Sequence, residues 1–124
     1  MSGIPWGVAE IGGFVTNDDW SEEFQELMIR WYQYGVFTPV FRTHGKRGNN
    51  NNEPWNLGGD TYKHIKQCLR LREALRPYIR QQMELATSKG IPPMRPMLFD
   101  FPNQEQLYDI RRSISFWVRS SDCT

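Results

Sequence analysis

The chain has 124 residues, enough for one domain of ordinary size, and its formal net charge is +1. This near-neutral balance argues against a nucleic-acid partner or an anionic membrane surface, and no apolar run approaches the length of a membrane span. The two cysteines, Cys68 and Cys123, lie too far apart for a metal-ligand or redox motif. We therefore expect no nucleic acid, no membrane, no metal and no cofactor among its partners.

The first predicted element is a buried parallel strand over residues 3–9, an apolar run bounded by turn-forming residues. Pro5 must lie near its start, because proline cannot donate a hydrogen bond to a neighbouring strand. Residues 10–19 are predicted to form a loop with two glycines and a cluster of Asn and Asp residues. Glu10 directly follows the strand, so we expect its carboxylate at the strand end with little access to solvent.

A helix is predicted from Glu22 to Gly35. Ser21 is a suitable N-cap, since its hydroxyl can accept a hydrogen bond from a free amide of the first turn. Gly35 is expected to end the helix. The buried face is predicted from apolar residues at helical spacing: Phe24, Leu27, Met28, Trp31 and Tyr34.

The second predicted strand covers residues 36–41, although Pro39 lies within it. A long polar loop rich in glycine and asparagine follows over residues 43–59. Because this loop contains Pro54 and Trp55, we interpret it as a loop beside a site rather than a low-complexity linker.

Asp60 is expected to cap a long helix, which Pro77 kinks or breaks and which Gly90 ends. Residues 94–101 are predicted to form a short extended element, and no element is predicted for residues 111–124. Four arginines in the long helix repeat at helical spacing and predict a solvated face rather than a phosphate-binding patch. These are Arg70, Arg72, Arg76 and Arg80.

Strand, polar loop and helix follow one another twice, which is typical of a (β/α) barrel with its chemistry at the carboxyl ends of the strands. A complete barrel of this kind needs roughly 250 residues. The predicted fold class is therefore α/β, a partial and incomplete (β/α)8 TIM barrel that holds only a few strand–helix units.

Polar groups at the two predicted strand ends are the candidate site residues. For Glu10 two explanations stay open: a structural ion pair with Arg42, or a contact with a sugar hydroxyl. His44 is either structural or a ligand contact, and its place before a glycine-rich loop favours the ligand contact. Asp18 and Asp19 share the loop with Glu10, but we interpret them as turn and helix-start residues.

Ordered motifs recur along the chain: GIP at 3–5, IGGF at 11–14, RWYQYG at 30–35, FTPVFR at 37–42, LREALRPY at 71–78, MRP at 94–96 and FDFP at 99–102. Together these motifs closely resemble glycoside hydrolase family 31. The resemblance extends from about residue 3 to residue 102 and places the chain at the seventh and eighth strands, the last strand–helix units of the catalytic barrel.

The resemblance implies an enzyme of the α-glucosidase or α-xylosidase type, a retaining α-glycosidase that hydrolyses O-glycosyl bonds in carbohydrate metabolism. The family's two catalytic carboxylates lie on earlier strands, so this chain is expected to supply no catalytic residue and to be inactive in isolation. The substrate-binding residues that the resemblance implies are His44, on the hydroxyls of the non-reducing-end sugar, Phe14 in the pocket wall, and Arg42 and Glu10 as supports.

Two departures from the family pattern bear on these expectations. Glu10 stands where the family has aspartate, and residues 110–124 do not resemble the β-sandwich that follows the barrel. We therefore expect residues 1–102 to be a barrel fragment and residues 103–124 a divergent tail, produced by a truncated gene, altered splicing or a frame change.

The expected partner is an α-linked oligosaccharide, xyloside or glucoside, and Gly45 after His44 favours the xylosidase branch. The oligomeric state is left open. The alternative function is a non-catalytic truncated fragment or a weak sugar-binding remnant.

Overall fold

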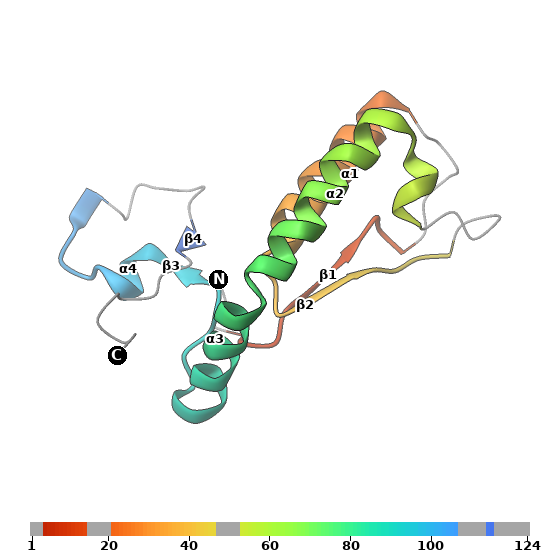
Figure 1. The fold of residues 1–124 in the computed structure, drawn as a ribbon. Helices are drawn as coiled ribbons and strands as arrows, with labels where there is room; N and C mark the ends of the chain where they lie inside the picture. The colour runs from red at the N-terminus through yellow and green to blue at the C-terminus, as the bar shows by residue number, and fades with distance from the viewer. Residues whose placement is uncertain (1–3, 15–20, 47–52, 107–113, 116–124) are drawn as a thin grey trace.

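The computed structural model describes residues 4–14, 21–46, 53–106 and 114–115. Two parallel strands, β1 (Val8–Ile11) and β2 (Val40–Thr43), form one sheet, and helix α1 (Glu22–Gly35) lies between them in the chain (Figure 1). This order of parallel strand, helix and parallel strand is the βαβ unit that the sequence predicts.

The second half of the described chain is mainly helical. A 3-10 turn, η2 (Pro54–Leu57), precedes helices α2 (Gly59–Ala74) and α3 (Arg76–Lys89). Three short elements end the described part: β3 (Arg95–Pro96), α4 (Met97–Asp100) and β4 (Ile114–Ser115), with β3 and β4 antiparallel.

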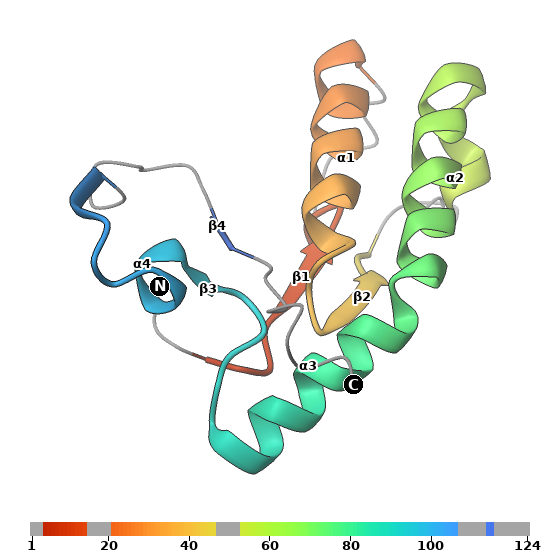
Figure 2. The ribbon, with the colours of Figure 1, turned by 60° about the vertical axis from the view of Figure 1, so that its left-hand side comes forward.

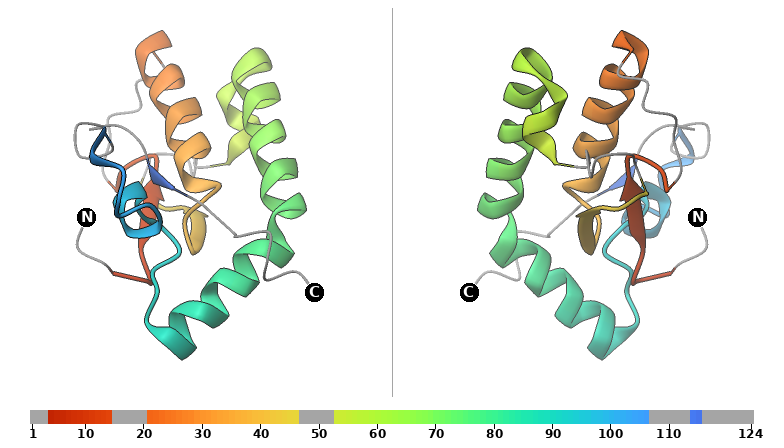
Figure 3. Two further views of the ribbon diagram at one scale, coloured as in Figure 1. Left: turned by 90° about the vertical axis from the view of Figure 1, so that its left-hand side faces the viewer. Right: turned by 90° about the vertical axis from the view of Figure 1, so that its right-hand side faces the viewer.

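Helices α1 and α2 lie side by side, and α1 contacts both parallel strands (Figure 2). Helix α3 continues from α2 in a new direction (Figure 3), and the group formed by β3, α4 and β4 lies apart from the α1–α2 pair (Figure 1). In the described part of the chain, no helix is long and apolar enough to cross a membrane.

Both parallel strands begin later than the sequence predicts. β1 starts at Val8 because the residues around Pro5 form a bend, and Glu10 is the third residue of the strand rather than the first residue after it. β2 starts at Val40 because the chain turns between α1 and the strand. The Thr38 hydroxyl stabilises this turn, lying 2.7 Å from the carbonyl oxygen of Gly35 and 2.8 Å from that of Val40.

Helix α1 has the predicted bounds and the predicted N-cap. The Ser21 hydroxyl accepts a hydrogen bond of 3.3 Å from the backbone amide of Phe24. The buried face differs from the prediction, because Leu27 and Tyr34 are 50% and 48% exposed whereas Tyr32 is buried. The Tyr32 ring packs edge-on against Phe41 of β2, with ring centroids 5.8 Å apart.

Gly35 is the last residue of α1, but its role is close packing rather than a left-handed helix end. A Cβ atom at this position would lie 2.7 Å from Cδ1 of Ile11 and 3.1 Å from the Phe41 ring. The helix therefore approaches the sheet at a distance that only glycine allows.

The core lies between α1, α2, η2 and one face of the parallel sheet. Its buried members come from all of these elements: Ile11, Met28, Tyr32, Val36, Leu57, Ile65 and Cys68. Burial raises the pKa of the Cys68 thiol, because the charged thiolate loses its hydration there.

The sheet has one covered and one uncovered face. Alternate residues of a strand point to opposite faces, so Ile11 and Phe41 lie toward the core while their neighbours do not. On the other face, Val8 is 47% and Val40 is 41% exposed.

The predictions for the helical half hold in part. Pro77 does break the long helix, and Gly90 ends α3 with a φ of 68° and an amide that donates to the Ala86 carbonyl. Asp60 does not cap α2: Gly58 occupies the N-cap position, and Asp60 lies in the first turn, where it pairs with Lys63 at 2.8 Å.

The extended element predicted over residues 94–101 is only partly correct. Arg95 and Pro96 form a short strand, but α4 makes one helical turn from Met97 to Asp100. In the region where no element is predicted, Ile114 and Ser115 pair with β3. The other residues beyond 106, like residues 15–20 and 47–52 of the two predicted loops, lie outside the described residues.

Candidate functional site

Residues Glu10 and Arg42 meet across the two parallel strands. The strand register places them opposite one another. The Arg42 guanidinium donates a hydrogen bond of 2.6 Å to Oε1 of Glu10. The ion pair that the sequence left as one explanation of Glu10 is therefore present in the structure.

His44 joins this pair from the loop that follows β2. Its Nε2 atom lies 3.6 Å from Oε2 of Glu10, so the carboxylate lies between a guanidinium and an imidazole. The Phe14 ring lies beside the imidazole, with ring centroids 5.3 Å apart. All four sequence-predicted site residues thus gather at the carboxyl end of the parallel sheet.

The loops after the two strands are tied to one another by backbone hydrogen bonds. The His44 amide donates to the carbonyl of Ile11, and the Lys46 amide donates to that of Phe14 at 2.7 Å. Gly12 and Gly13 have φ values of 98° and 67°, a backbone conformation that other L residues rarely adopt. These glycines turn the chain directly after β1 and so place Phe14 beside His44.

The cluster is more accessible to solvent than the sequence predicts for Glu10. The side chains of Glu10, Arg42 and His44 are 36%, 49% and 44% exposed. The expectation of little solvent access is wrong for this chain, because Glu10 lies on the uncovered face of the sheet. An ion pair this exposed contributes about 1 kcal/mol or less to stability. Its importance therefore lies in how it positions the side chains of the cluster.

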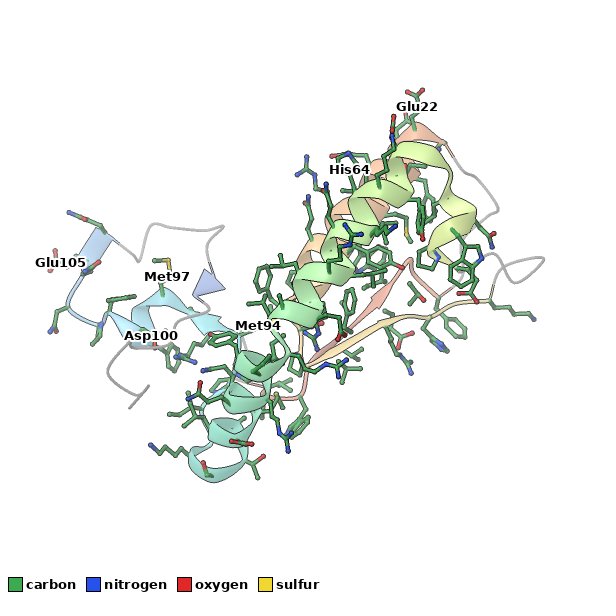
Figure 4. All side chains as sticks on the ribbon, in the orientation of Figure 1. Glu22, His64, Met94, Met97, Asp100 and Glu105 are labelled. Carbon is green, nitrogen blue, oxygen red and sulfur yellow. The ribbon has the colours of Figure 1, made fainter. Side chains whose placement is uncertain are left out.

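The other polar residues considered in the sequence analysis do not contribute to this cluster in the described part of the structure. Asp18 and Asp19 lie outside the described residues. His64 projects from α2 and is exposed (Figure 4). Within the described ranges, no three His, Cys, Asp or Glu side chains gather as metal ligands would.

Arg72 is the residue whose role the sequence analysis missed. It is half-buried and donates hydrogen bonds to backbone carbonyls, whereas Arg70, Arg76 and Arg80 are exposed. The expected solvated face is thus wrong for Arg72. Helical spacing could not reveal this, because the carbonyls belong to a distant turn.

Comparison with known proteins assigns the family. The model of the glycosyl hydrolases family 31 TIM-barrel domain matches residues 1–82 of this chain. The chain is 36% identical over 110 residues to alpha-glucosidase 2 of Bacillus thermoamyloliquefaciens, covering 89% of this chain and 13% of that protein. It is 32% identical over 116 residues to an alpha-xylosidase of Saccharolobus solfataricus, covering 94% of this chain and 16% of that protein.

Solved structures agree with this assignment. A family 31 alpha-xylosidase from a soil metagenome, complexed with xylose, is 42% identical with a TM-score of 0.82, covering 92% of this chain and 20% of that chain. A family 31 dextranase of Flavobacterium johnsoniae, complexed with glucose, is 31% identical with a TM-score of 0.68, covering 92% of this chain and 14% of that chain.

The chain therefore belongs to glycoside hydrolase family 31, a family of hydrolases with a TIM-barrel domain. It spans only 11% to 16% of the length of three curated relatives that it matches. Those relatives are named as α-glucosidases and an α-xylosidase.

Proposed function

We propose that this chain is a late segment of the catalytic barrel of a retaining α-glycosidase and supplies part of its sugar subsite. The observation that carries the proposal is the gathering of Glu10, Arg42, His44 and Phe14 at the carboxyl end of two parallel strands. In (β/α) barrels the active site is built at this end.

The uncovered face of the sheet supports the barrel interpretation. In a complete barrel, side chains that point away from the surrounding helices fill the interior in layers. Val8 and Val40 would then point into an apolar part of the interior, and Glu10 and Arg42 would point into it nearer the carboxyl ends of the strands. Neighbouring strands would then remove the Glu10–Arg42 pair from solvent and strengthen it.

Each site residue has a chemical role in this proposal. The His44 imidazole can donate or accept a hydrogen bond with a sugar hydroxyl, and the Glu10 carboxylate holds it in place. Arg42 fixes the orientation of the Glu10 carboxylate through its hydrogen bond. The Phe14 ring supplies an apolar wall against the C–H face of a pyranose.

The catalytic carboxylates are proposed to lie on strands that this chain does not contain. A retaining mechanism needs two carboxyl groups roughly 5 Å apart, one as nucleophile and one as acid/base. Glu10 is occupied by Arg42 and His44, and no second carboxylate joins their cluster among the described residues. The substrate class is an α-linked glucoside or xyloside, and Gly45 after His44 favours the xyloside.

A non-catalytic fragment or weak sugar-binding remnant is the second candidate. The lack of a second carboxylate beside Glu10, among the described residues, favours it. The genomic sequence upstream separates the two proposals. Carboxylates in frame on strand-like segments would support the enzyme segment, and their absence would support the remnant.

The direct test is an assay of the purified chain with aryl α-xyloside and aryl α-glucoside. We expect no turnover, together with weak saturable binding of xylose or glucose that His44→Ala reduces by about 1 kcal/mol. His64→Ala is the matched control, since it removes the exposed histidine of α2. Turnover that disappears in Glu10→Gln would show that the chain carries its own catalytic carboxylate and would overturn the assignment.

A further inference from the structure

Arg72 spans the gap between α2 and the turn that precedes β2. Its Nη1 atom donates hydrogen bonds to the carbonyl oxygens of Val36 and Thr38, at 2.7 Å and 2.6 Å. Its Nη2 atom donates to the carbonyl oxygen of Pro39 at 3.0 Å. One side chain of α2 thus holds three carbonyls of the segment that connects α1 to β2.

The guanidinium also contacts the strand itself. Its central carbon lies 5.5 Å from the centroid of the Phe41 ring, within the range of a cation–π interaction. Burial lowers the pKa of the Arg72 guanidinium from its ordinary value, while the neighbouring Glu73 carboxylate opposes that change. The carbonyl oxygens and the ring therefore replace part of the hydration that the cation loses.

The short strands alone do not fix how β2 lies against β1. Each strand has four residues, so few backbone hydrogen bonds define the pairing. A shift by one residue would move every side chain of β2 to the other face. Arg42 and His44 would then leave Glu10, so the site depends on where the strand begins.

We propose that Arg72 is a positioning residue that fixes the start of β2 and thereby places Arg42 and His44 beside Glu10. The inference rests on the proposed function only for the use of that cluster as a sugar subsite. Arginine suits this role because its planar guanidinium presents five donors in a fixed fork and can stack on an aromatic ring, whereas a lysine ammonium has three donors and no planar face.

The two histidines of the chain provide the readout, because each gives its own imidazole signal in the NMR spectrum of the histidine-labelled full chain. The Phe14 ring shifts the His44 signal as long as the two rings stay 5.3 Å apart. His64 lies on α2 outside the cluster and reports whether the helix is folded.

Arg72→Met removes every donor and keeps the aliphatic stem. Arg70→Met is the matched control, since Arg70 is exposed on the same helix.

We expect Arg72→Met to move the His44 signal most of the way to its unfolded position and to leave that of His64 in place. Arg72→Lys should move His44 partway, and Arg70→Met should move neither signal. A His44 signal that stays in place while the thermal unfolding midpoint of Arg72→Met falls would overturn the proposal, because Arg72 would then only stabilise the fold.

An unfolded His64 signal would show that Arg72→Met does not fold. In that case the Arg72→Lys variant tests the positioning role. An unmoved His44 signal in that variant, or failure of both variants to fold, also overturns the proposal. Sugar binding by the unaltered chain is measured separately. If it is absent while Arg72→Met still moves the His44 signal, the proposed function fails and the positioning role stands.

Discussion

Gly35 illustrates how a single missing side chain sets the distance between a helix and a sheet. Alanine there would gain about 1 kcal/mol of helix propensity. Its Cβ atom, however, would lie 2.7 Å from Cδ1 of Ile11, which is 1% exposed and has little room to move. Overpacking of a closed core costs about 1–3 kcal/mol. Because the gain in helix propensity offsets part of the overpacking cost, we expect Gly35→Ala to lower the free energy of unfolding by about 1 kcal/mol in urea denaturation.

A double-mutant cycle identifies the contact responsible. Ile11→Val removes Cδ1 and by itself costs about 1 kcal/mol. Because it also removes the closest clash, the double variant should be more stable than the sum of the single effects predicts, by about 1 kcal/mol. Simple additivity would mean that Gly35 serves something other than the approach of Ile11.

Tyr78 is expected to lower the stability of the folded chain at alkaline pH. Burial raises the pKa of its phenol above the ordinary 10.0, with a smaller opposing effect from Arg95 and a smaller supporting one from Asp100. Below pH 10 the phenol is neutral in both folded and unfolded chains, and it does not affect stability there. Above that pH the unfolded chain ionises first, so stability should fall until the pH passes the raised pKa. Urea midpoints over this range should fall less for Tyr78→Phe, and equal slopes would contradict the assignment.

At the scale of elements, Arg95 and Asp100 hold the segment after α3 together. Nε and Nη2 of Arg95 donate to Asp100 at 2.8 to 3.1 Å, and Nη1 donates to the Pro92 carbonyl at 3.1 Å. Their side chains are only 10% and 20% exposed. Figure 4 shows Asp100 in the group that lies apart from the α1–α2 pair. The ion pair therefore joins α4 to β3 more than it supports the main core.

We expect Asp100→Asn to open this group locally. Asn keeps one acceptor oxygen but cannot neutralise the largely buried Arg95, so the lost charged hydrogen bond costs about 1–3 kcal/mol. Hydrogen exchange should accelerate in residues 92–106 and stay unchanged in α1. Asp60→Asn is the control, because the Asp60–Lys63 pair is exposed and its loss should change little. Equal acceleration throughout the chain would show that the ion pair supports the whole fold instead.

At the scale of the whole molecule, the parallel sheet leaves one apolar face uncovered. Val8 and Val40 lie opposite one another on it, and Trp6 just before β1 is 60% exposed. Open strand edges can pair with a strand of another chain, and an exposed apolar face can pack against another molecule. We expect the sedimentation coefficient of the isolated chain to rise with its concentration.

The double variant Val8→Glu, Val40→Lys should suppress this rise, because it places an opposite-charge pair across the strands without disturbing the core. Leu27→Glu with Leu71→Lys is the matched control, since these exposed residues lie on α1 and α2. Equal suppression by both variants would mean that association depends on general hydrophobicity rather than on the sheet face.

Much of the local structure is determined by the sequence itself. The N-cap at Ser21, the helix break at Pro77 and the helix end at Gly90 depend on neighbouring residues, and all three were predictable for that reason. The gathering of Glu10, Arg42, His44 and Phe14 was predictable as well, but from the order of the strands rather than from neighbouring residues. Polar residues after successive parallel strands must meet at one edge of the sheet.

Only the tertiary structure decided the starts of the strands, the buried face of α1 and the role of Arg72. Each depends on contacts with another element: Val8 pairs with Val40 where the two strands begin, Phe41 of β2 packs against Tyr32, and Arg72 donates to the Val36–Pro39 carbonyls. The exposure of Glu10 to solvent is also a property of the tertiary structure. Its face of the sheet is open because burial depends on which elements lie opposite, and local sequence does not contain that information.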